Sequence, residues 1–376
     1  MKKMISILLS VLLVCALLTT TVFAAPADPQ RALTAWLQNA DNTQFDYTDT
    51  SYPDSLVDWT AFTLAQSGAA PDAAYADYIN ETVKNSFDSL YPSDLARLVL
   101  STTACGLDAR VIGGYDLLAA LGAVDYASQI YLSNLAFPLL AMDFSASFDF
   151  PDSTKQSIIN TLLAAQQADG GFPYCSVDEG WGISSDCDTT AMAVQALAPY
   201  YETDEVVREA VDKALVYLKA QQFDTGAFGS AVFGTQSGES TAQVILALCA
   251  LGLDPTAEEY CKNGVSPVEA LADFISENGG GLNYANAEDP LTTYQLLQAY
   301  EAYARFQNGE PTLFTYTARA FEPTTEPVAD TTAPETESEQ PVETVDIPNT
   351  GAAVPATAVL TVLAAATVLT MQKKHA

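Results

Sequence analysis

The chain has 376 residues, of which 49% are hydrophobic, enough to bury the core of one large domain or two small ones. Fifteen Lys and Arg residues oppose 47 Asp and Glu residues, which gives a formal net charge of -32 at pH 7. Such a charge repels phosphate backbones and excludes nucleic-acid binding. The single histidine, His375, lies next to the C-terminus, so Ser-His-Asp and Cys-His catalysis are also excluded. We expect no metal site and no cofactor.

Residues 1–24 have the pattern of a secretory signal peptide. Lys2 and Lys3 precede an apolar run over residues 4–18, and small residues surround Ala24. This pattern predicts cleavage after Ala24 or Ala25 and export of the remaining chain.

Residues 27–321 show the hydrophobic periodicity of helices, and we expect twelve helices in six consecutive pairs. The first, more polar members are predicted near residues 30–39, 73–86, 111–121, 153–167, 204–222 and 267–278. The second, more apolar members are predicted near residues 56–66, 94–104, 130–142, 188–200, 240–251 and 291–307. A polar outer ring around an apolar inner ring is an all-α fold, the (α/α)6 toroid.

An internal repeat supports this arrangement. In each copy a glutamine ends an amphipathic helix, a glycine follows four residues later, and an aromatic residue follows after two more. These positions are Gln166, Gly170 and Phe172 in the first copy and Gln222, Gly226 and Phe228 in the second. A third stretch, residues 270–282, keeps the glycines but has no matching glutamine.

The repeat resembles the QW motif of squalene cyclases and related prenyltransferase-type toroids, with Phe228 where that family usually has Trp. The resemblance implies that the glutamine binds free backbone groups at the helix end and that the aromatic ring packs beside it. It also implies the toroid fold of the terpenoid cyclase and protein prenyltransferase superfamily. The zinc site of the protein prenyltransferases is not implied, because its histidine ligand is missing.

The sequence SDCDTT, residues 185–190, resembles the DxDD(T) acid motif of class II terpenoid cyclases, whose central Asp protonates an alkene or epoxide. Asp186 matches the first Asp and Asp188 the protonating one, while Thr189 replaces the last Asp. The resemblance makes Asp186 and Asp188 candidate catalytic residues. Alternatively, Asp188 is the N-cap of the helix that follows, in which case the helix end lowers its pKa and opposes acid catalysis.

The connection over residues 168–187 is long and is expected to cover the ends of the inner helices at the toroid mouth. Candidate ligand-binding residues in this loop and in an equivalent later turn are Phe172, Tyr174, Glu179, Trp181 and Tyr284. The alternative is that they fill the mouth as a small satellite core. Cys175 and Cys187 flank the loop and are expected either to form a disulfide or to stay unpaired.

The C-terminal part has the layout of a surface anchor. Residues 322–346 are rich in Thr, Pro and Glu and predict a disordered spacer. The sequence IPNTG, residues 347–351, resembles the LPxTG-type sorting signal of Gram-positive surface proteins, and an apolar segment, residues 352–371, and a basic tail follow. The resemblance implies that a sortase cleaves between Thr350 and Gly351 and joins the chain to peptidoglycan. Before processing, or if the segment is retained, it would span the cytoplasmic membrane. Both interpretations place the toroid outside the cell.

Two classes of function remain open. The first, which is the leading hypothesis from the sequence, is a non-catalytic module that binds a small molecule, a glycan or a surface protein at the N-terminal ends of the inner helices. The second is an enzyme that uses Asp186 and Asp188, either a degenerate class II terpenoid cyclase or a glycan-active (α/α)6 enzyme. The glycan enzyme needs two carboxylates across a cleft, which Glu179, Asp186, Asp188 and Glu239 can supply. A raised carboxyl pKa in a deep apolar cavity would favour the cyclase, and a shallow aromatic mouth the binding module.

Overall fold

The computed structural model describes residues 26–180, 182–230 and 234–317. The signal peptide, the spacer, the sorting signal with Thr350 and Gly351, and Trp181 lie outside the described residues. No helix of the described ranges is both long and apolar enough to cross a membrane.

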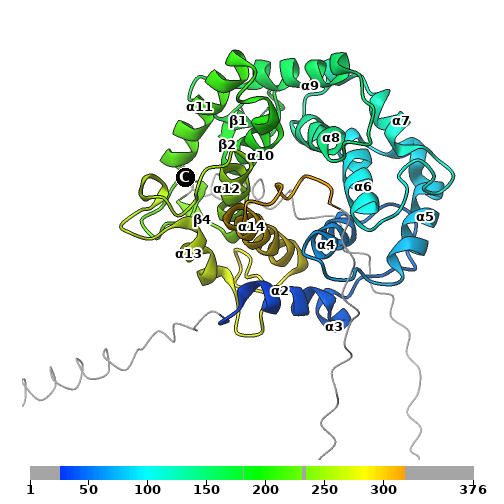
Figure 1. Ribbon diagram of the computed structural model, residues 1–376, viewed down its shortest axis with the longest axis horizontal. Helices are drawn as coiled ribbons and strands as arrows, with labels where there is room; N and C mark the ends of the chain where they lie inside the picture. Colours follow the sequence, from blue (N-terminus) through cyan, green and yellow to red (C-terminus); the bar gives the residue numbers. More distant parts are fainter. Residues whose placement is uncertain (1–25, 181, 231–233, 318–376) are drawn as a thin grey trace, which may run out of the picture. The chain divides into compact units, whose positions relative to one another are not determined.

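The described residues form two concentric rings of helices (Figure 1). The inner helices are α4 (Ser55–Gln66), α6 (Pro92–Ala104), α8 (Ser133–Asp143), α10 (Cys187–Leu197), α12 (Gly238–Ala250) and α14 (Pro290–Asn308). The outer helices are α2 (Pro29–Gln38), α5 (Tyr75–Ser86), α7 (Leu117–Gly122), α9 (Asp152–Ala165), α11 (Glu205–Ala220) and α13 (Pro267–Leu271), with the short α3 (Ala40–Thr43) after α2. Each inner helix packs against the next, and α14 packs against α4, which closes the ring. The predicted (α/α)6 toroid is confirmed.

Short elements connect these helices. The 3-10 turns are η1 (Phe87–Ser89), η2 (Tyr126–Ser128), η3 (Ala198–Tyr200), η4 (Glu258–Tyr260) and η5 (Ala272–Phe274). The strands form two antiparallel hairpins, β1 (Phe172–Pro173) with β2 (Ser185–Asp186) and β3 (Gly229–Ser230) with β4 (Thr235–Gln236). Phe172 faces Asp186 in the first hairpin, and Gly229 faces Gln236 in the second.

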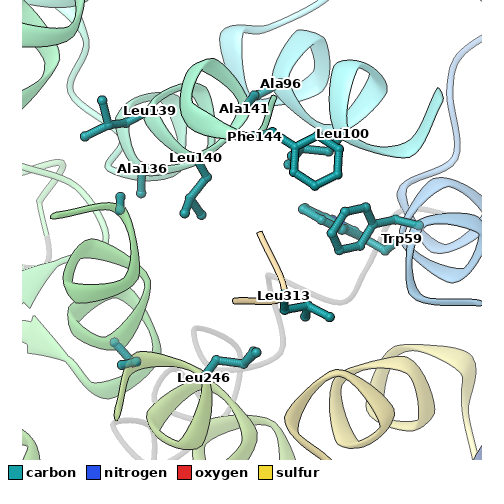
Figure 2. Close-up of a cluster of buried hydrophobic side chains, with 14 of the residues drawn as sticks. Trp59, Ala96, Leu100, Ala136, Leu139, Leu140, Ala141, Phe144, Leu246 and Leu313 are labelled. Atoms are coloured by element: carbon teal, nitrogen blue, oxygen red, sulfur yellow. The ribbon is translucent and has the colours of Figure 1, made fainter. Parts of the chain in front are cut away.

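The two rings differ in burial as their sequences predict. Helix α12 is buried on nearly all sides, because its neighbours in the inner ring flank it and an outer helix covers it. Helix α2 buries one face only, through Leu33, Trp36 and Leu37. Large buried side chains from several inner helices point toward the centre, among them Trp59, Leu140 and Leu246 (Figure 2).

Two outer helices are shorter than the sequence predicts. Helix α7 begins at Leu117 rather than at residue 111, because Gly113 and Gly114 adopt φ angles of 60° and 87° in a turn before it. Helix α13 ends at Leu271, and η5 and a turn replace the expected helix to residue 278.

The sequence repeat corresponds to a repeated turn before three inner helices. In each turn a backbone amide donates to a threonine hydroxyl in the first turn of the helix. The pairs are Phe172 with Thr190 at 2.8 Å, Phe228 with Thr241 at 3.0 Å and Gly281 with Thr293 at 2.9 Å. The third turn keeps this bond although its sequence has no matching glutamine, so the structural repeat extends further than the sequence motif.

The glutamines of the first two copies bind backbone carbonyl groups. Gln166 Nε2 donates to the carbonyl oxygens of Gly170 and Ala210 at 2.8 and 2.7 Å. Gln222 makes the matching two bonds at 3.0 and 2.6 Å. Because Ala210 lies in α11, the first glutamine joins the end of one outer helix to the middle of the next.

The glycine of the motif cannot carry a side chain. Gly170 has φ +91°, and a Cβ there would lie 2.5 Å from the carbonyl oxygen of Lys213. We expect Gly170→Ala to lower the free energy of unfolding by about 3 kcal/mol, measured by urea denaturation, because it combines a left-handed backbone with a clash. Gly252→Ala is the matched control, because Gly252 has φ +70° with no atom near its Cβ position. Equal losses for both variants would contradict the close approach.

Candidate functional site

The acidic residues of the SDCDTT segment sit at the start of α10, and their roles differ from the N-cap hypothesis. Asp186, not Asp188, is the N-cap, and its Oδ1 accepts from the backbone amide and the hydroxyl of Thr189, both at 2.8 Å. Asp186 is extended because it pairs with Phe172 in the β1–β2 hairpin, so α10 begins at Cys187. The expectation that Asp188 caps the helix is therefore wrong.

Asp188 lies within the first turn of α10 and is only partly exposed. Its Oδ1 atom is buried and has no hydrogen-bond partner among the described residues. Burial above all, together with the negative charges of Asp186 and Glu239, raises the pKa of the Asp188 carboxyl to about 7, against the opposing effect of the Ser240 hydroxyl. A carboxyl with this pKa holds a proton near neutral pH, as a general acid requires.

Glu239 occupies the position on α12 that Asp188 occupies on α10. Both are two residues after the N-cap, which is Asp186 in α10 and Ser237 in α12. Glu239 is partly buried, and its Oε1 accepts from the Thr292 hydroxyl of α14 at 2.5 Å. Two carboxyl groups on neighbouring inner helices thus lie at the same end of the ring.

Asp188 lines a small cavity of about 110 Å³ inside the inner ring. The other lining residues are aromatic, amide or thioether side chains, namely Trp59, Phe137, Met192, Gln195, Gln243, Tyr294, Gln295, Gln298 and Phe314. Among the residues that the structure describes, no Lys or Arg side chain lines this cavity. The cavity therefore offers amide groups, aromatic faces and one acid to a ligand.

The glutamines of this cavity form a connected network across three inner helices. Gln195 Nε2 donates to Gln243 Oε1 at 2.9 Å, and Gln243 Nε2 donates to Gln295 Oε1 at 2.9 Å. Gln298 donates to the Thr63 hydroxyl of α4 at 2.8 Å. Fixed amides of this kind select hydroxyl-bearing ligands.

Sequence reasoning missed these glutamines, although the repeat held a signal for them. Gln195 and Gln298 each follow the repeat threonine of their helix by five residues, and Gln243 and Gln295 follow theirs by two. A polar residue at a repeated position of an otherwise apolar inner helix indicates a lining residue.

The structure separates the loop residues that were expected to bind a ligand. Phe172 is fully buried in the core and is not accessible from the mouth. Tyr174 is exposed, and its ring centroid lies 5.5 Å from that of Tyr131. Glu179 accepts a hydrogen bond from the Tyr131 hydroxyl at 2.7 Å. Tyr284 is 82% exposed in the turn before α14. Of these residues, none lines the Asp188 cavity.

The cysteines of the described ranges form no disulfide. Cys175 and Cys187 both have free thiols in the structure. Within the described ranges, no group of three or more His, Cys, Asp and Glu side chains is arranged to hold a metal ion.

No protein-family model matches the chain, and neither does any curated protein. Solved structures do match it. A variant of unsaturated glucuronyl hydrolase from Streptococcus agalactiae is 12% identical with a TM-score of 0.51, and the match covers 73% of this chain and 90% of that chain. An unsaturated glucuronyl hydrolase specific for heparin is 15% identical with a TM-score of 0.51, covering 74% and 97%. A type II terpene cyclase, MstE from Scytonema, is 12% identical with a TM-score of 0.49, covering 74% and 98%. The structural neighbours are toroid enzymes, and at these identities the likeness shows the fold alone.

Proposed function

We propose that this toroid is a glycan-active enzyme in which Asp188 is the general acid and the substrate is a neutral sugar. The observation that carries the proposal is a buried carboxyl group with a pKa of about 7, facing a cavity of amide and aromatic side chains. Aromatic rings stack on the apolar face of a sugar ring, and amides bind its hydroxyl groups. Two solved structures with TM-scores of 0.51 are named unsaturated glucuronyl hydrolases, and this likeness supports a sugar as the class of substrate.

In the proposed reaction, Asp188 donates its proton to the glycosidic oxygen as the bond from that oxygen to the anomeric carbon breaks. The leaving sugar departs with a new hydroxyl group. A water molecule attacks the anomeric carbon and gives a proton to Glu239, which is the second carboxylate of the pair. Transfer of this proton back to Asp188 through solvent restores the starting state.

Charge favours a neutral substrate over an acidic one. The whole chain carries a formal net charge of -32. Asp188 lines the cavity, and the nearby charges of Asp186 and Glu239 add to the negative potential at its carboxyl group. Because the lining contributed by the described residues holds no cationic side chain, a uronate carboxylate would have no charged partner there. We therefore expect neutral hexosides to be preferred over unsaturated uronides.

The cyclase alternative shares the acid but fits the cavity less well. The pattern of Asp186 and Asp188 resembles the cyclase motif, and a pKa of about 7 suits protonation of an alkene. However, four glutamine side chains line the cavity, and a hydrocarbon could not use the amide donor and acceptor positions that their mutual hydrogen bonds leave open. The signal peptide and sorting signal predicted from the sequence would in addition place the toroid at the cell surface, joined to peptidoglycan by a sortase.

The test is to incubate the purified protein with neutral oligosaccharides, uronate-containing oligosaccharides and polyisoprenoid alkenes, and to follow products by mass spectrometry. We expect cleavage of a neutral oligosaccharide, and a loss of about 10²–10⁴-fold in kcat for Asp188→Asn. Val216→Ala is the matched control, because Val216 is an exposed residue of the outer helix α11 and does not line the cavity. Cyclised alkene products would favour the cyclase, and binding of a sugar without turnover would favour a non-catalytic module.

A further inference from the structure

The centre of the toroid is crossed by the segment that follows α14, residues 309–317, which we call the C-terminal strap. The strap enters the ring from the C-terminal ends of the inner helices (Figure 1). Its Leu313 is 2% exposed and lies in the middle of the ring, among side chains of the inner helices (Figure 2). Phe314 follows and stacks on Phe62 of α4, with ring centroids 5.4 Å apart.

Buried polar groups hold the strap in place. Gln66 Nε2 donates to the carbonyl oxygen of Leu313 at 3.0 Å, and Arg305 Nη1 donates to that of Thr312 at 3.1 Å. The amide of Tyr316 donates to the carbonyl oxygen of Phe144 at 2.6 Å. Anchors from α4, α14 and the end of α8 fix the position of Phe314 between them.

Phe314 lies between two cavities of different character. On one side is the Asp188 cavity of about 110 Å³, near the N-terminal ends of the inner helices. On the other side is a cavity of about 680 Å³ near their C-terminal ends, whose lining is mostly apolar and includes Leu140, Leu246, Ala302, Phe306 and Leu313. Phe314 and Gln195 are the two residues that line both cavities. Gln195 belongs to the glutamine network through its bond to Gln243, so Phe314 is the boundary residue that can be substituted without breaking that network.

We propose that Phe314 determines the substrate specificity of the Asp188 site by closing its floor. The ring limits the site to a short ligand group and keeps apolar chains in the larger cavity away from the acid. This inference rests on the proposed function for its substrate class. A smaller residue at position 314 would join the two cavities, so that a ligand with a sugar head and an alkyl tail could occupy both.

The first test measures the affinity of methyl, butyl and octyl β-glucosides by calorimetry. In the wild-type protein we expect affinity to change little with tail length. In Phe314→Ala we expect at least a tenfold gain from methyl to octyl, because the tail gains an apolar compartment. Phe306→Ala is the matched control, because Phe306 lines the larger cavity only, and it should keep the wild-type profile. A flat profile for a folded Phe314→Ala protein would overturn the proposal.

The second test does not depend on sugar binding. The side-chain carboxyl carbon of Asp188, assigned by comparison with Asp188→Asn, is followed by NMR during titration with n-octanol. We expect no shift in the wild-type protein and a saturable shift in Phe314→Ala, with Phe314→Leu as a second variant that retains more packing against Phe62. A shift in the wild-type protein, or none in either variant, would overturn the role of Phe314. If no glucoside binds any variant while the octanol result is as expected, the proposed sugar substrate is wrong. The role of Phe314 in separating the two cavities is then still supported.

Discussion

The Asp188→Asn variant is expected to be more stable than the wild-type protein above pH 7 and about equally stable below pH 4. The folded-state pKa of Asp188 is raised to about 7, above the value of 3.8 for an unperturbed Asp. Between these values the folded protein holds a proton that the unfolded chain has lost, so wild-type stability falls as pH rises, until Asp188 ionises in the folded state near pH 7. A difference of about three pKa units between the folded and unfolded states lowers the free energy of unfolding by about 4 kcal/mol above pH 7. The asparagine variant does not ionise and so avoids this loss.

The measurement is urea denaturation of both proteins from pH 4 to pH 9, because the difference between them isolates Asp188 from all other titrating groups. Asp186→Asn is the control. Asparagine also caps helices, so this variant keeps the start of α10 and removes one negative charge near Asp188. It should recover only part of the difference. Parallel stability curves for wild type and Asp188→Asn would show that the carboxyl titrates normally.

Functional sites often contain a carboxyl group whose ionisation lowers the free energy of unfolding. Asp188 lies beside Asp186 and Glu239, which both oppose its ionisation, and within the described part of the chain its Oδ1 atom has no hydrogen-bond partner. A residue selected for stability alone would be neutral or paired. The structure thus separates the roles of the two acids, because Asp186 fixes the helix start and Asp188 holds the proton.

The ring itself was predictable from local sequence patterns. Helical periodicity marks the buried faces. Gln166 and Gln222 mark the ends of two outer helices, and each is followed by its glycine and its aromatic residue at the same spacing. The start of α10 was not predictable in the same way. It is set by pairing of Asp186 with Phe172, a contact between residues separated by a long loop. Tertiary pairing therefore decided which of two nearby Asp residues became the cap.

The candidate site was partly predictable. The two Asp residues were named as candidates from the sequence alone, and the glutamines would emerge from aligning the repeats. Phe314 had no such signal. It follows the last helix of the ring and belongs to no repeat, and its place depends on anchors from Gln66 and Arg305 far along the chain.

Replacement of Arg97 by leucine is expected to lower the free energy of unfolding by about 3–5 kcal/mol. Arg97 is buried in α6, where Nε contacts Asp58 Oδ2 at 2.9 Å and Nη1 contacts Asp94 Oδ1 at 2.8 Å. Burial raises the pKa of Asp58 to about 6 even with the opposing charge of Arg97. Without Arg97, two buried carboxyl groups lose their cation, so the loss should be greatest at pH 8 and smaller near pH 5, where Asp58 takes up a proton.

Lys84→Leu is the matched control for this experiment, because Lys84 pairs with Glu81 at 3.2 Å on the exposed surface and should change stability little. A loss at pH 8 no greater than that of the control would show that Asp58 and Asp94 are stabilised without Arg97.

The Arg97 substitution should also weaken ligand binding at the Asp188 cavity. Asp58 directly precedes Trp59, which lines the Asp188 cavity, so loosening the contact between α4 and α6 would displace a wall of the site. We therefore expect the Arg97 variant to lose sugar affinity at pH 8 while the Lys84 variant retains it.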